Sequence, residues 1–104
     1  MPNYADLARD KSQQGRIRLS HHAQVERVNE NIRTDDIVEA LRNGQAVETY
    51  PNDPRGPSTL IAGQDKQSRW IHVVCGNFDQ EYMLVITVYI PQLPKWKDPF
   101  TRER

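Results

Sequence analysis

Apolar residues in the N-terminal part of the chain recur at the three- and four-residue spacing of helices. This spacing predicts three helices, over residues 3–14, 21–31 and 35–43. Asn3 is predicted to cap the first helix, Ser20 the second and Thr34 the third, because a side-chain oxygen accepts hydrogen bonds from the free N–H groups of a first helical turn. Gly44 is predicted to end the third helix in a left-handed conformation.

From residue 45 onward the apolar spacing changes to that of strands. Four strands are predicted, over residues 45–50, 58–62, 69–75 and 81–90. Segment 51–57 contains three prolines and is therefore predicted to be a loop. Helices followed by consecutive strands indicate an α+β fold, with N-terminal helices packed on one face of a four-stranded antiparallel sheet.

Alternation along the last two strands separates two faces of the predicted sheet. One face is nearly all aliphatic and is expected under the helices: Ile71, Val73, Cys75, Tyr82, Leu84, Ile86, Val88 and Ile90. The opposite face is mixed: Trp70, His72, Val74, Met83, Val85, Thr87 and Tyr89. Pairing of Gly76 with Glu81 would set His72 opposite Val85. His72, Thr87 and Tyr89 would then share the open face, which makes them a candidate site.

Composition narrows the class of protein. Lys and Arg total 14, and Asp and Glu total 14, so the formal net charge is zero. A dedicated nucleic-acid binder normally carries a basic excess, so any basic patch must be local. One cysteine, Cys75, excludes an internal disulfide. Neither a signal-peptide pattern nor a membrane-spanning apolar run is evident, so we expect a cytoplasmic protein that does not contact membranes.

Several short segments follow one another along the chain: Ser20-His21-His22-Ala23, the segment 32–44, Tyr50-Pro51, His72-Val73-Val74, Ile86-Thr87-Val88-Tyr89, Pro91 and Trp96. In this order they resemble the DUF4258 family, small bacterial proteins of unassigned function. The resemblance extends from about Arg18 to Arg104. It implies a single domain over residues 1–104, with an N-terminal extension at 1–17 and a C-terminal tail at 91–104.

The family in turn resembles the barnase/EndoU/colicin/RelE superfold, which includes metal-independent ribonucleases and toxins of toxin–antitoxin pairs. The resemblance implies that the recurrent polar positions are His22, His72, Thr87 and Tyr89. Glu26 stands where family members often carry arginine. The neighbouring Arg27 points about 100° away around the helix, so it does not occupy the same space.

These positions lead to a ribonuclease hypothesis that needs no cofactor. In RNA the 2′-hydroxyl is the nucleophile, so catalysis needs a base, an acid and a cation at the phosphate. His22 and His72 are the expected acid/base pair, in an order that the sequence does not decide, while Tyr89 orients the phosphate or donates a proton. The expected substrate-binding residues are Arg27, Lys66, Arg69 and Trp70. The expected partners are RNA and an antitoxin-like protein.

Three other interpretations compete with this hypothesis. His72 is equally a strand histidine hydrogen-bonded beside the core. A metal site of His21, His22 and His72 is disfavoured, because adjacent helical histidines point about 100° apart. Zero net charge and Glu26 suit a non-catalytic domain that binds a partner through Trp70, Met83 and Tyr89 on the open face. The sequence leaves the oligomeric state open.

Overall fold

The computed structural model describes residues 3–103, in which all three helices precede every strand but the first. The helices are α1 (Tyr4–Gln13), α2 (His21–Asn29) and α3 (Thr34–Asn43). The strands are β1 (Ile17–Leu19), β2 (Gln45–Tyr50), β3 (Ser58–Gln64), β4 (Trp70–Gly76), β5 (Met83–Tyr89), β6 (Trp96–Asp98) and β7 (Thr101–Arg102). The predicted α+β class is confirmed, and the predicted helices and strands begin and end within a few residues of the observed bounds.

Two of the helix starts follow the capping pattern read from the sequence. The Asn3 side chain accepts a hydrogen bond from the N–H of Asp6, and Ser20 Oγ accepts one from the N–H of Ala23 at 3.0 Å. The prediction of a Thr34 cap is wrong. Asp36 reaches back and accepts the N–H of Arg33 at 2.7 Å, so Arg33 is the cap and Thr34 is the first helical residue.

The prediction for Gly44 is also wrong, because its backbone is extended, with φ −78° and ψ 160°. A Cβ at this position would lie 2.4 Å from Ile61 Cγ2 and 2.7 Å from the carbonyl oxygen of Ala40. Gly63 on β3 is tighter still, since its Cβ would lie 1.9 Å from the same carbonyl oxygen. Glycine is needed here because the end of α3 lies directly on β3, and no left-handed turn is involved.

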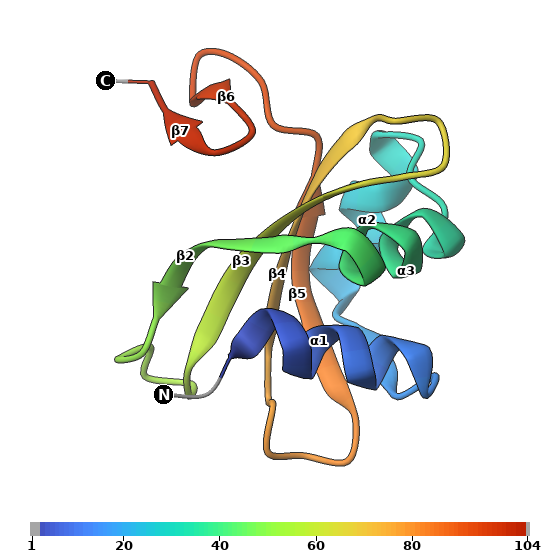
Figure 1. Ribbon diagram of the computed structural model, residues 1–104, viewed down its shortest axis with the longest axis vertical. Coiled ribbons are helices and arrows are strands. Elements are labelled where there is room, and N and C mark those ends of the chain that lie inside the picture. The colour runs from blue at the N-terminus through green and yellow to red at the C-terminus, as the bar shows by residue number, and fades with distance from the viewer. Residues whose placement is uncertain (1–2, 104) are drawn as a thin grey trace.

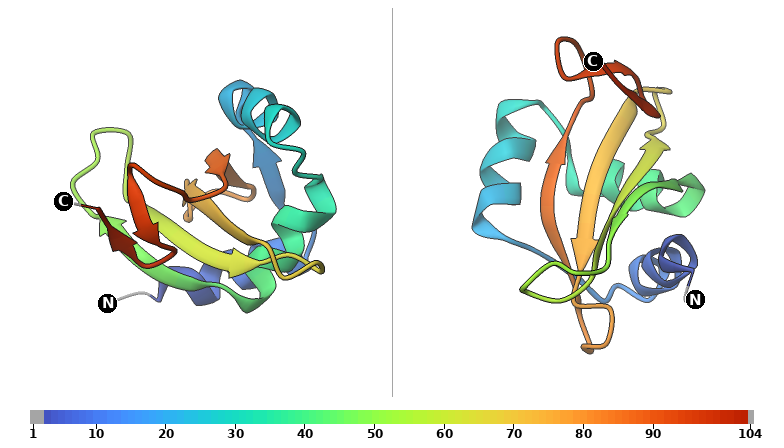
Figure 2. Two further views of the ribbon diagram at one scale, coloured as in Figure 1. Left: turned by 90° about the horizontal axis from the view of Figure 1, so that it is seen from above. Right: turned by 90° about the vertical axis from the view of Figure 1, so that its left-hand side faces the viewer.

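The sheet has the strand order β1-β5-β4-β3-β2. Strands β2 to β5 form the predicted antiparallel meander, and β1 adds a parallel edge strand that pairs Ile17 with Met83 and Leu19 with Val85. Helix α3 contacts β3 and β4 and α1 packs beside it, while α2 runs along β5 (Figure 1). The β6–β7 hairpin lies over one end of the opposite face of the sheet (Figure 2).

A β-bulge in β5 changes the predicted register. Val74 pairs with Thr87, whereas Cys75 pairs with Val85, so Ile86 is the extra residue. The two pairings that the sequence predicted are replaced by Gly76 with Leu84 and His72 with Tyr89. A bulge cannot be read from alternation, because one inserted residue reverses the faces of all residues before it.

The bulge therefore exchanges the two faces along the first half of β5. Met83 and Val85 are fully buried in the core under the helices, although alternation placed them on the open face. Leu84 and Ile86 take the opposite face, where they line a cavity. Tyr82, predicted to lie under the helices, is 37% exposed.

Carboxylates at helix α2 accept hydrogen bonds from the part of the β5 edge that does not pair with β1. The N–H of Val88 donates to Glu26 Oε1 at 3.2 Å, and the N–H of Ile90 donates to Glu30 Oε2. Thr87 Oγ1 also donates to Glu26 Oε1. The carboxylates thus take the place of a neighbouring strand, which gives Glu26 a structural reason to differ from the arginine expected at that position.

Candidate functional site

His72 lies in the middle of β4 and has no exposed surface. Its Nε2 is 2.6 Å from the carbonyl oxygen of Pro99, which only accepts, so Nε2 carries a proton. With Nε2–H in the neutral ring, Nδ1 accepts from the hydroxyl of Tyr89 at 3.1 Å. The indole of Trp96 covers the ring edge-on, with centroids 4.4 Å apart. Both imidazole nitrogens are therefore occupied, and the ring is closed off from solvent.

The cover over His72 comes from the C-terminal hairpin. The guanidinium of Arg102 lies over the Trp96 ring at 4.6 Å and pairs with Glu48 of β2 through two contacts of 2.7 and 2.8 Å. Hydrogen bonds from Arg102 and from the Tyr50 hydroxyl lower the pKa of Glu48 to about 2. An ionised Glu48 therefore holds the hairpin on the sheet across the ordinary pH range.

Burial lowers the pKa of His72 below its ordinary 6.5, although its hydrogen bond to Pro99 and the charge of Glu48 act in the opposite direction. A lowered pKa means that the unfolded chain takes up this proton more readily than the folded chain. The stability from a neutral His72 is thus fully present above pH 6.5 and is lost as the pH falls through the lowered folded pKa.

We therefore expect the free energy of unfolding to fall between pH 7 and pH 5, by at most about 1.4 kcal/mol per pH unit for one proton. Urea unfolding at several pH values measures this slope. His72→Gln, which cannot titrate, should show a shallower slope than the wild type. Identical slopes in the two proteins would show that His72 is not the source of this pH dependence.

His22 lies in the first turn of α2, and its side chain is 68% exposed. Its Nε2 is 3.2 Å from Glu26 Oε1, the same oxygen that accepts from Thr87. The cap from Ser20 and the bonds from β5 to Glu26 hold this turn of helix in place. His22, Glu26 and Thr87 therefore form one connected group, with the imidazole at its solvent end.

The structure does not bring His22 and His72 into a shared cleft. His22 lines a cavity that borders Gly76 and Leu84, at the end of the sheet where β4 finishes. Gly76 lies four residues beyond His72 along the strand, which is roughly 13 Å. His72 and Tyr89 instead lie under the C-terminal hairpin, and among residues 3–103 no contact joins them to His22.

None of the expected substrate-binding residues lines the cavity at His22. Arg69 is engaged in the fold, since it pairs with Asp65 at 2.8 Å and bonds to the backbone between α2 and α3. Lys66 is in the exposed β3–β4 turn, at the far end of the sheet. Arg27 bonds to Gln24 and to a carbonyl after α2, and Trp70 packs edge-on against Phe100. The sequence alone does not show where in the fold each of these side chains lies, so it could not show that none of them reaches this cavity.

The cavity at His22 has a volume of about 260 Å³. Leu84 and Ile86 line one part of it, and the loop between β2 and β3 contributes Asp53 and Arg55. The side chain of Arg55 is 77% exposed, and its Nε lies a loose 3.4 Å from Asp53 Oδ1. Hydrogen bonds from Arg55 lower the pKa of Asp53, so this carboxylate is charged. An orientable cation, its partner carboxylate and an imidazole therefore face one cavity that is partly lined by apolar side chains.

Sequence reasoning missed Arg55 and Asp53 because segment 51–57 was read only as a connection. The signal was present: a charged pair enclosed by three prolines and a glycine, in a loop too constrained to be a flexible linker. Only the fold could show that this loop crosses to the start of α2.

The sequence profile of the DUF4258 family, described as a domain of unknown function, matches residues 19–90. The chain belongs to this family. Comparisons with curated proteins and with solved structures find no match. The region matched to DUF4258 contains His22, His72, Thr87 and Tyr89. The residues that cover His72, namely Trp96, Pro99 and Arg102, lie beyond it.

No helix among residues 3–103 has the length and apolar character to cross a membrane. No three His, Cys, Asp or Glu side chains there are grouped so that they could hold a metal ion. Cys75 is fully buried, and burial raises the pKa of its thiol above the ordinary value.

Proposed function

We propose that this chain is a metal-independent ribonuclease of toxin type, whose reacting groups face the cavity between α2 and the β2–β3 loop. The observation that carries the proposal is that His22, held on the carboxylate of Glu26, faces the same cavity as Arg55. A histidine oriented by a carboxylate is a recurrent acid/base device, because the carboxylate stabilises the imidazolium that forms.

The reaction follows from these groups. Neutral His22 takes the proton of a 2′-hydroxyl, whose oxygen attacks the adjacent phosphorus. The bond from phosphorus to the 5′-oxygen breaks, which leaves a 2′,3′-cyclic phosphate and a 5′-hydroxyl. Arg55 neutralises the charge that grows on the phosphate oxygens. The protonated imidazole returns its proton to the leaving 5′-oxygen, so protons and electron pairs balance.

This assignment differs from the sequence hypothesis in three respects. His72 and Tyr89 are given no chemical step, because they bond to each other and the C-terminal hairpin covers the imidazole. Thr87 is a positioning residue that donates to Glu26. Arg55 replaces the arginines and lysine that lie elsewhere on the fold.

The test is incubation of the purified protein with single-stranded RNA in EDTA. We expect fragments ending in 2′,3′-cyclic phosphate, while matched DNA and 2′-O-methyl RNA stay intact because they lack the nucleophile. Intact RNA across several sequences and pH 5 to 8, or equal cutting of DNA, would overturn the proposal.

A second candidate is a non-catalytic domain that binds a protein partner of antitoxin type. It is favoured by the outer side of α2, where Val25 and Val28 are 44% and 65% exposed. The open sheet face is less suited to this role than the sequence indicated, because Met83 is buried in the core and the hairpin covers part of the face. A stable complex that is lost in Val28→Asp, with no loss of RNA, would favour this candidate.

A further inference from the structure

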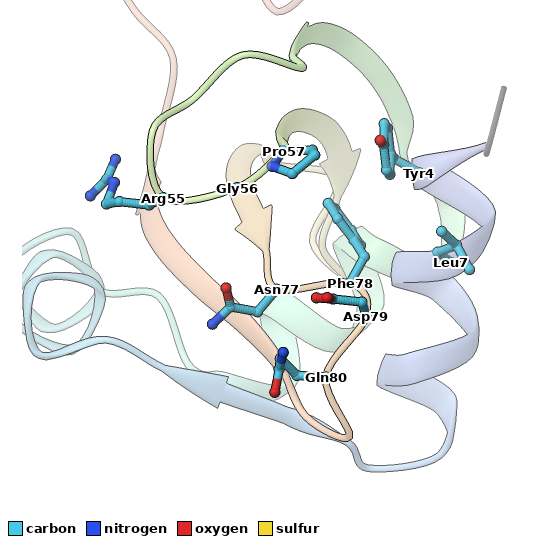
Figure 3. Close-up of a pocket in the computed structure, with 9 residues that line it drawn as sticks. All are labelled: Tyr4, Leu7, Arg55, Gly56, Pro57, Asn77, Phe78, Asp79 and Gln80. Atoms are coloured by element: carbon cyan, nitrogen blue, oxygen red, sulfur yellow. The ribbon is translucent and has the colours of Figure 1, made fainter.

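A second cavity adjoins the one at His22 (Figure 3). Its volume is about 500 Å³, within the usual range for pockets that bind small molecules or cofactors. It lies between the start of α1, the β2–β3 loop and the β4–β5 turn. The two cavities share Arg55, Gly56, Pro57 and Asn77. The side chain of Arg55 points away from the rings of Tyr4 and Phe78 (Figure 3).

Aromatic rings form one wall of this cavity. The rings of Tyr4 and Phe78 lie 4.7 Å apart at an angle of 32°, and both are half-buried. Leu7 and Pro57 line the cavity beside Phe78 (Figure 3). Half-buried aromatic faces beside a cavity suit a flat ring, and stacking of a nucleobase on such a face is indifferent to base identity.

The β4–β5 turn supplies hydrogen-bonding groups on the other side. The side chains of Asn77, Asp79 and Gln80 line the cavity, and within residues 3–103 none of them has a hydrogen bond or an ion pair. The turn itself is held firmly. Lys11 Nζ donates to the carbonyl oxygens of Gln80 and Glu81 at 2.6 and 3.0 Å. The amide and carboxylate groups of these side chains are therefore free to form hydrogen bonds with the edge of a bound ring, and the backbone that carries them is already fixed by Lys11.

Net charge bears on the kind of ligand. A chain with zero net charge has little long-range attraction for a polyanion, so most of the affinity for RNA must come from contacts other than those to phosphate. Stacking provides that affinity, and the one cation common to both cavities is Arg55.

We propose that the cavity at Phe78 holds one nucleobase of a single-stranded RNA, with the phosphate of that nucleotide on Arg55 and the next linkage at His22. This inference rests on the proposed function for its choice of substrate. It adds the subsite that would hold the base. With a single phosphate neutralised, the logarithm of the binding constant should fall with that of salt concentration at a slope of only about −0.7.

The test is binding of a 2′-O-methyl oligonucleotide of four residues, which cannot be cleaved through a 2′-hydroxyl. Phe78→Leu keeps an apolar side chain at the core but removes the aromatic face, and it should weaken binding by about 5- to 150-fold. Phe100→Leu, an exposed aromatic residue on the hairpin, is the matched control and should bind as the wild type does. Thermal unfolding checks that both variants are folded.

Amide chemical shifts place the ligand on the surface. We expect shifts at Asn77 to Gln80 and at Tyr4 in the wild type when the oligonucleotide is added. Absence of binding, equal binding by wild type and Phe78→Leu, or shifts confined to another surface would each overturn the inference. Because the probe is not cleaved, base binding without RNA cleavage would support the subsite and reject the ribonuclease. RNA cleavage that Phe78→Leu leaves unchanged would support the ribonuclease and reject the subsite.

Discussion

His22→Ala is expected to slow RNA cleavage by about 10²- to 10⁴-fold, the usual cost of losing a positioned acid/base group. His22 is largely exposed and supports little of the fold, so its removal should change the free energy of unfolding by less than about 0.5 kcal/mol. The loss should therefore fall on the rate and not on the amount of folded protein. Single-turnover cleavage of a labelled RNA in EDTA measures it.

His21→Ala is the matched control for this variant. His21 is the preceding residue of α2 and is exposed, but it does not line the cavity. The control variant should cleave at the wild-type rate. A His22→Ala protein that cleaves as fast as the wild type would remove the imidazole from the mechanism, and equal losses in both variants would point to a general effect on the helix.

Trp96→Ala is expected to lower the free energy of unfolding by about 3–5 kcal/mol, as for other buried aromatic residues replaced by alanine. Trp96 is 2% exposed, and its ring lies between the imidazole of His72 and the guanidinium of Arg102. The indole Nε1 has no hydrogen-bond partner in the described residues, so the loss is one of packing. Urea unfolding with Lys97→Ala, an exposed neighbour, as control measures this difference.

The same variant tests what keeps His72 neutral. Burial is the main reason that the pKa of His72 is lowered, and Trp96 is part of the cover. In folded Trp96→Ala the pKa of His72 should rise toward 6.5, as followed by the proton resonances of the imidazole. A free energy change below about 1 kcal/mol with an unchanged titration would show that the hairpin is not what buries this side chain.

Local structure was largely readable from the sequence. The Asn3 and Ser20 caps and the switch from helical to strand spacing near residue 45 depend on neighbouring residues alone, and the structure has both. The Thr34 cap was wrong for a local reason, since Asp36 caps the helix at Arg33. The other errors arose where a distant segment intervenes. Gly44 is extended because α3 lies against β3, and the bulge at Ile86 reverses a face that simple alternation had assigned.

The candidate site divides in the same way. The side chains capable of acid/base chemistry were recognisable as His22 and His72, because imidazole is the side chain that most often serves as a general acid or base. Which of them is accessible depended on residues far along the chain. Pro99 and Trp96 close off His72, while loop 51–57 carries Arg55 to the start of α2.

Helix and strand spacing, the Asn3 and Ser20 caps and the α+β class were thus encoded in contacts a few residues apart, which a linear reading follows. The burial of His72, the loop residues that share a cavity with His22 and the parallel pairing of β1 depend on contacts between residues tens of positions apart. Such contacts depend on how whole elements pack, and packing is cooperative, so no short stretch of residues specifies it.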